Sequence, residues 1–270
     1  MVAFAANSLL CRLTLGQGLI DASSFASVRI VAGAAMLWLI MLLRKRPGKR
    51  ARTDLRATAM LLTYMVFFAF AYRSLGAGTG ALILFGAVQL TMFARALQSG
   101  EHFSLPSWAG FVLAVGGLVY LVLPGVTAPD PVGALLMAVA GVAWGFYSLL
   151  GRGAVDALGS TARNFALAVP PALIVSLIFM ADFTATPHGL LLAALSGAIA
   201  SGCGYVIWYA ALPGLTATRA ATVQLTVPVI AALGGAMILS EQITPRLLIA
   251  SLATLGGVAI VLTRRTAPAK

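Results

Sequence analysis

Charged residues are scarce in this chain. Only 9% of its 270 residues are Asp, Glu, Lys or Arg, whereas a soluble domain carries about a quarter. Apolar residues make up 60% of the sequence, and the mean hydropathy is +0.98. So few charges exclude a mostly water-facing surface. Several stretches of about 18 residues or more hold few charges, which is the length that crosses a bilayer as a helix. We therefore expect an all-α polytopic membrane protein.

The residues that catalysis and metal binding require are also few. The two histidines, His102 and His188, lie near predicted loops, and we find neither paired carboxylates nor a metal-spaced His/Glu cluster. No G-x-x-x-x-G-K-[ST] motif occurs, which excludes an ATP-driven pump of the P-loop class. Cys11 and Cys203 both lie in apolar segments and are interpreted as small buried hydrophobic residues. We expect no enzyme activity, no metal and no cofactor.

Acidic residues are scarcer than basic ones, and the formal net charge is +11. The largest basic cluster runs from Arg44 to Arg56 between two apolar stretches, as in a cytoplasmic loop next to anionic headgroups. No aromatic–basic interleaving or finger spacing accompanies it, so we do not expect nucleic-acid binding. The expected partners are the lipid bilayer and a small-molecule substrate. The oligomeric state stays open, and a monomer is compatible with the sequence.

Apolar runs and the breaks between them predict ten helices. Their ranges are 2–18, 23–43, 55–73, 78–98, 107–123, 131–151, 163–181, 187–211, 216–239 and 246–263. With a cytoplasmic amino end, the basic loop and the Arg264-Arg265 tail fall on the inside, and only Arg73 and Arg246 lie outside. Because Lys and Arg are enriched in cytoplasmic loops, this asymmetry predicts that both termini are cytoplasmic.

Several landmarks recur at a constant offset of 140 residues. They are Arg12 and Arg152, Glu101 and Glu241, and Gly116-Gly117 and Gly256-Gly257. We interpret the chain as one five-helix unit written twice, with residues 1–127 as the first repeat and 128–270 as the second. Five is odd, so the second unit enters the membrane from the opposite side. Such inverted repeats are typical of secondary transporters, whose substrate site lies near the midplane between the halves. The first helix is shorter than its counterpart, which begins near Pro131, so we expect a longer natural amino end.

The segment TVQLTVPVIAALGGAMILSEQITPRLLIASLATLGGVAIVL resembles the ninth and tenth helices of the drug/metabolite transporter superfamily, EamA type. Its marks are Pro228, Glu241 and the glycine-rich last helix. The first-half segment GTGALILFGAVQLTMFARALQSGEHFS looks most like the bacterial aromatic amino acid exporters of that group. The resemblance implies ten helices around a central cavity, lined by helices one, three, four, six, eight and nine. The other four helices would pack outside. It also implies export across the bacterial inner membrane without ATP, by alternating access.

Neutral polar and aromatic side chains on the lining helices are the substrate-binding candidates. Amides can donate and accept hydrogen bonds without a buried charge, although they can equally tie helices together. Aromatic stripes can also be packing or interfacial belts. The candidates are Asn7, Tyr64, Phe68, Gln89, Trp144, Tyr147, Tyr205, Trp208, Tyr209 and Gln224. Rings with a few amides suit a zwitterion with a flat apolar side chain, such as an aromatic amino acid.

Hinge and helix-end positions form a second set. Pro228 interrupts a backbone hydrogen bond and is expected to act as a hinge or gate. Gly78 and Gly234 are interpreted as hinges or as close helix contacts. Glu101 and Glu241 lie at helix ends, where we expect a structural role, with proton coupling as the alternative.

Two arginines within predicted spans keep two interpretations. Arg12 is expected to snorkel to the interface, with binding of a substrate carboxylate as the alternative. Arg29 keeps the same two interpretations, and the sequence favours neither. The alternatives for the whole protein are a drug or other metabolite exporter of the same superfamily, or a membrane channel. A small four-helix proton-coupled exporter is disfavoured, because the first helix has no acidic residue.

Overall fold

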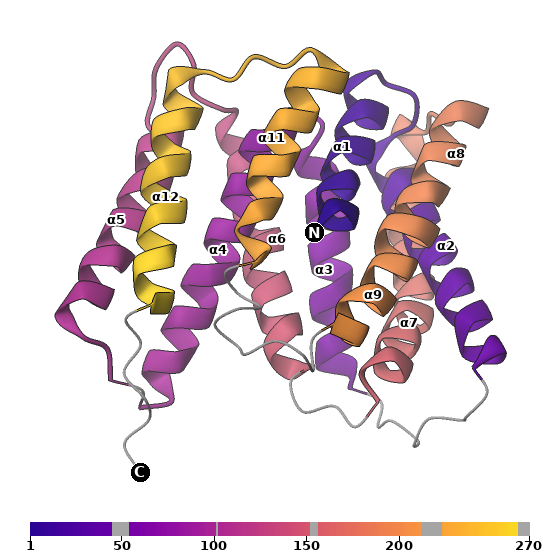
Figure 1. Ribbon diagram of the computed structural model, residues 1–270. Helices are drawn as coiled ribbons and strands as arrows, with labels where there is room; N and C mark the ends of the chain where they lie inside the picture. Colours follow the sequence, from indigo (N-terminus) through magenta and orange to yellow (C-terminus); the bar gives the residue numbers. More distant parts are fainter. Residues whose placement is uncertain (45–53, 101, 152–155, 212–222, 264–270) are drawn as a thin grey trace.

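The computed structural model describes residues 1–44, 54–100, 102–151, 156–211 and 223–263. In chain order these residues form α1 (Val2–Gly16), α2 (Ala22–Leu43), α3 (Leu55–Ala71), α4 (Ala77–Gln98), α5 (Leu105–Val122), α6 (Pro131–Leu150), α7 (Ala157–Ile178), the 3-10 turn η1 (Met180–Asp182), α8 (Pro187–Leu195), η2 (Ser196–Cys203), α9 (Gly204–Ala211), α11 (Thr226–Leu239) and α12 (Pro245–Thr263). Within this part of the chain the regular structure is entirely helical, and the helices run up and down one bundle (Figure 1).

Seven helical segments of the described residues are long and apolar enough to cross a membrane. They are α2, α4, α5, α6, α7, the run from Pro187 to Trp208, and α12. Large apolar side chains also cover the perimeter: Trp38 is 66% exposed, Leu252 76% and Met237 84%. A soluble monomer rarely exposes so much apolar surface, whereas a bilayer solvates it. The chain is therefore an all-helical, multi-pass membrane protein.

Aspartate side chains at helix starts explain several boundaries. Asp21, Asp54 and Asp130 each accept a backbone N–H in the first turn of α2, α3 and α6. Such caps satisfy N–H groups that have no partner within the helix. Hydrogen bonds from Gly133 N–H and then from the Ser74 hydroxyl lower the pKa of Asp130.

The start of α7 differs most from its prediction. We expected a loop up to residue 163, but α7 begins at Ala157. The Asp156 carboxylate caps it by accepting the N–H of Gly159, and Arg44 at the end of α2 donates to both Asp156 oxygens at 3.0 and 3.1 Å. The prediction missed this helix turn because it followed hydropathy and did not use Asp156 as a cap. Of the predicted range 216–239, residues 216–222 lie outside the description, and α11 begins at Thr226 after a turn at Leu225; the other predicted ranges agree closely with the described helices.

The helices pack as one bundle, with α5 and α12 paired along one side and α2 near the opposite side (Figure 1). Between them, α3 and α4 both pack on α6, and α11 packs on α4 and α1. The segment η2 lies against α2 and α1. The amino end lies midway along the bundle rather than at its end (Figure 1).

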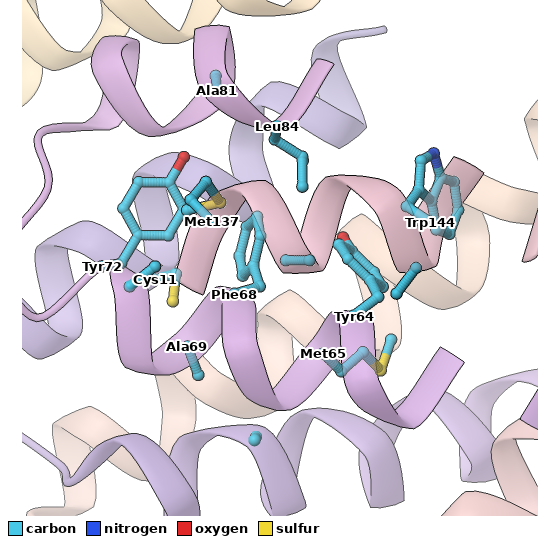
Figure 2. Packing of buried hydrophobic residues seen from close by; sticks show 14 of the residues in the cluster. Cys11, Tyr64, Met65, Phe68, Ala69, Tyr72, Ala81, Leu84, Met137 and Trp144 are labelled. Atoms are coloured by element: carbon cyan, nitrogen blue, oxygen red, sulfur yellow. The ribbon is translucent and has the colours of Figure 1, made fainter. Parts of the chain in front are cut away.

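One stripe of α3 forms the middle of the buried core. Figure 2 shows Tyr64, Phe68 and Tyr72 in a row along α3, facing Met137 and Trp144 of α6. Tyr72 is fully buried, and its hydroxyl donates to the carbonyl oxygen of Ala77 at 3.2 Å.

Candidate functional site

Aromatic side chains from α1, α3, α6, α7 and α9 meet in one group, which we call the aromatic cluster. Its members are Phe4, Tyr64, Phe68, Trp144, Tyr147, Phe165, Tyr205 and Trp208. The Trp144 ring lies at its middle, with centroid distances of 4.8 Å to Tyr64, 5.5 Å to Tyr205 and 6.3 Å to Phe4. Six candidates from three predicted helices are thereby brought together. Phe4 and Phe165 were missed, Phe165 because the resemblance assigned its helix to the outside.

A chain of hydrogen bonds between buried polar groups borders the aromatic cluster. Asn7 Oδ1 accepts from Ser196 Oγ at 2.8 Å and from Ser201 Oγ at 3.3 Å. Ser201 Oγ in turn accepts from Arg29 Nε at 3.2 Å, and Arg29 Nη2 donates to Tyr64 Oη at 3.0 Å. These contacts join α1, α2, α3 and η2. We call these five residues the polar chain.

The segment η2 supplies both serines of the polar chain, and it is a π-helix inserted between α8 and α9. A π-helix places one extra residue in each turn, so it changes which side chains face a neighbouring helix, and such segments are frequent at functional sites. Ser196 and Ser201 are both fully buried. Gly197, between them, packs directly on the Arg29 carbonyl, where a Cβ would clash.

Arg29 is the most unusual residue of this region. Its side chain is 1% exposed, and Nη1 has no hydrogen-bond partner. The guanidinium carbon lies 4.8 Å from the Phe68 ring centroid and 5.4 Å from that of Tyr64. Arg29 therefore does not snorkel to an interface, and the second helix reaches the interior although the resemblance placed it outside. The sequence identified the charge but not its depth.

Comparisons with known proteins agree with this helical architecture. The model of the EamA-like transporter family matches residues 131–263. Uncharacterized protein PA1977 of Pseudomonas aeruginosa is 51% identical over 265 residues, which cover 98% of this chain and 92% of that protein. This chain belongs to the EamA-like transporter family.

More distant relatives agree with the EamA assignment. The uncharacterized transporters YoaV and YwfM of Bacillus subtilis are 22% and 25% identical to this chain and cover 84% and 82% of it. The crystal structure of a protein that is 18% identical matches with a TM-score of 0.69 over 98% of both chains, which shows a shared fold. EamA members are membrane transporters of small metabolites and not enzymes. Among the described residues, no three His, Cys, Asp or Glu side chains gather as a metal site requires.

The remaining amide and aromatic candidates of this EamA chain lie apart from the aromatic cluster or outside the description. Gln89 is buried on α4, its Nε2 has no partner, and it borders a narrow crevice with Phe111 of α5 and Val258 of α12. Gln224 is buried just before α11, and no described contact joins it to the aromatic cluster. Tyr209 belongs to α9, but its side chain lies outside the described residues.

The hinge candidates lie at tight helix contacts. A Cβ at Gly78 would lie 2.7 Å from Ala232 Cβ, and one at Gly234 would lie 2.6 Å from Leu9 Cδ1, so both glycines let α11 approach its neighbours. Pro228 is the third residue of α11, and the helix is interrupted at Leu225 just before it. A proline ring clashes with the carbonyl four residues earlier, which accounts for a break at this position.

Glu241 joins three helices beyond the end of α11. Its Oε1 accepts from Arg12 Nε at 2.9 Å, and its Oε2 accepts from the N–H of Ala77, the first residue of α4, at 2.8 Å. The carboxylate thus pairs with a cation and caps a helix whose N-terminal dipole favours an anion. Arg12 also donates to the carbonyl oxygens of Tyr72 and Arg73 at 3.4 Å. Glu101, the counterpart of Glu241 in the predicted repeat, lies outside the described residues.

Proposed function

We propose that this protein is a secondary transporter that exports amino acids across the bacterial inner membrane by alternating access. Aromatic amino acids are its proposed main substrates, with other neutral ones or similar small metabolites beside them. The observation that carries this proposal is the meeting of the aromatic cluster with the polar chain. Flat rings accept a flat apolar side chain, and a few fixed polar groups orient its charged end.

Contacts between equivalent residues support two inverted five-helix repeats, ten helices in all. In the register of 140 residues, Phe4 is the counterpart of Trp144, and these two rings contact each other at 6.3 Å. A residue that touches its own counterpart lies close to a two-fold axis. The aromatic cluster therefore surrounds the proposed axis, which is where inverted-repeat transporters bind their substrates.

A second pair of contacts obeys the same symmetry in α5 and α12. Gly117 packs on Thr254, and the reciprocal contact joins their counterparts, Gly257 and Ala114. Reciprocal contacts of this kind are expected for a self-complementary interface. Because the two repeats are inverted and similar, two conformations that open to opposite sides have comparable energies. The basic loop and the basic carboxyl end of the sequence support a cytoplasmic location for both termini.

Transport into proteoliposomes tests this function. We expect saturable uptake of phenylalanine or tryptophan, with counterflow when the lumen is preloaded. The rings of the aromatic cluster contact one another in this conformation, so a substrate ring must replace one of these contacts. Trp144→Ala should lower uptake efficiency roughly fivefold, because an aromatic contact contributes about 1 kcal/mol beyond its area.

Trp38→Ala is the matched control for Trp144→Ala. Both substitutions remove an indole, but Trp38 is 66% exposed on the outer surface of α2. Uptake should be unchanged in this variant. Flux that rises linearly with concentration and shows no counterflow would favour a channel. Saturable flux of cationic drugs in place of amino acids would favour a drug exporter.

A further inference from the structure

Arg29 carries a positive charge into the protein interior without an anion beside it. The acidic residues of the described part all lie at or beyond helix ends, and they are Asp21, Asp54, Asp130, Asp156, Asp182 and Glu241. The ion pairs among the described residues join Arg12 to Glu241 and Arg44 to Asp156. Arg29 is eight residues into α2, and its described hydrogen-bond partners are two neutral hydroxyl groups.

Those two hydroxyl groups accept hydrogen bonds from only some of the guanidinium N–H donors. Arginine has five N–H donors, and Nε and Nη2 of Arg29 supply the bonds to Ser201 and Tyr64. Both N–H groups of Nη1 are buried and unsatisfied. An isolated charge inside a membrane protein is costly and usually functional, and an unpaired buried donor adds to the cost. An anion that binds Nη1 would remove both penalties.

The surroundings of Arg29 also restrict what that anion can carry. The guanidinium lies over the rings of Phe68 and Tyr64, and Tyr64 contacts Trp144 in the aromatic cluster. A ligand held at Nη1 is therefore next to ring surfaces. Planar guanidinium groups bind planar carboxylates through two parallel hydrogen bonds.

We propose that Arg29 binds the carboxylate of the transported substrate, while the aromatic cluster binds its apolar group. The proposal rests on the proposed transport function and specifies its substrate class as small aromatic carboxylates. The amino group of a zwitterion then contributes little, because no described acidic side chain lies near Arg29. Cationic and amidated analogues are excluded for the same electrostatic reason.

A series of ligands with the same ring tests this assignment. Purified full-length protein is titrated with phenylalanine, 3-phenylpropionate, phenylalaninamide and phenethylamine, and tryptophan fluorescence reports binding. The first two carry the carboxylate and should bind on the order of tenfold to a hundredfold more tightly than the other two, as expected for charge-assisted hydrogen bonds. Equal binding of all four ligands by a protein that transports phenylalanine saturably would overturn the role of Arg29 and leave the transport function standing. If no ligand binds and none is transported, both proposals fail.

Variants then assign the preference to one residue. Arg29→Gln should remove the difference in affinity between phenylalanine and phenylalaninamide. Arg29→Lys should keep a weaker preference for phenylalanine, because lysine retains the charge without the planar group. Arg95→Gln is the matched control, since Arg95 is exposed near the end of α4 and bonds to Gln98. A merely structural Arg29 would change the stability of the protein but not the ratio of the two affinities. If folded Arg29→Gln keeps the full ratio, the assignment is wrong; if it does not fold, the Lys variant and the wild-type ligand series decide.

Discussion

The Arg12–Glu241 pair offers a stability test that can be worked from the structure. Glu241→Gln keeps the size of the side chain and removes the charge, so it leaves no cavity. The side chains of Arg12 and Glu241 are 26% and 22% exposed. An exposed pair contributes 0–1 kcal/mol and breaking a buried one costs about 3–5, so a partly exposed pair should contribute about 1–2 kcal/mol. Loss of an anion at the start of α4 adds about 0.3–1 kcal/mol.

We therefore expect Glu241→Gln to lower the free energy of unfolding by about 2 kcal/mol. For a chain of this size, that corresponds to a fall in Tm of roughly 4–8 °C, measured by thermal unfolding in mild detergent. Asp182→Asn is the control, because it removes an exposed acid in η1 without breaking an ion pair.

A double-mutant cycle shows whether the loss belongs to the pair. If the structure is correct, Arg12→Gln and Glu241→Gln together should cost about 1 kcal/mol less than the sum of the single losses. Exchanging the two residues should not restore stability, because an arginine at position 241 would place a cation at the N-terminus of α4. Strictly additive losses, or full recovery in the exchanged variant, would refute this reasoning.

Two further predictions concern helix packing and capping. Gly117→Ala should lower the free energy of unfolding by about 1–3 kcal/mol, because its Cβ would lie 2.5 Å from Thr254 Oγ1. The neighbouring Gly116→Ala would meet nothing within 4 Å and should leave Tm unchanged or slightly higher. Equal effects of the two substitutions would contradict the α5–α12 contact. The lowered pKa of Asp130 stabilises the folded state above the unfolded pKa of about 3.9, and this stabilisation is lost as the pH falls through the folded value. Asp130→Asn should therefore have a lower Tm than the wild type at pH 7, and the difference should shrink below about pH 4; a difference independent of pH would exclude the carboxylate as its cause.

Hydropathy and local capping determine most of the helix bounds, which is why they could be predicted from the sequence. Each span is fixed by about 20 consecutive residues, and caps such as Asp21 and Asp54 act within a few residues of their own position. The exception is the start of α7, where hydropathy did not reveal the cap Asp156, whose carboxylate also binds Arg44 more than a hundred residues earlier. Interactions of that range leave no periodic signal in the sequence.

The candidate site was predictable in its residue types but not in its arrangement. Aromatic residues such as Tyr64 and Trp144 were predicted because the resemblance assigned their helices to the cavity lining, and they do contact each other. Gln89 has the same chemistry as Asn7 but borders a crevice apart from the aromatic cluster. The rotation of each helix about its axis decides which side chains face the aromatic cluster. In a lipid solvent, apolar side chains can lie on the face toward lipid or on the face toward the bundle. The sequence by itself determined a membrane-spanning helical chain with rings and few charges. Only the tertiary structure decided that Arg29 is buried beside those rings, because the π-helical η2 brings Ser201 against α2.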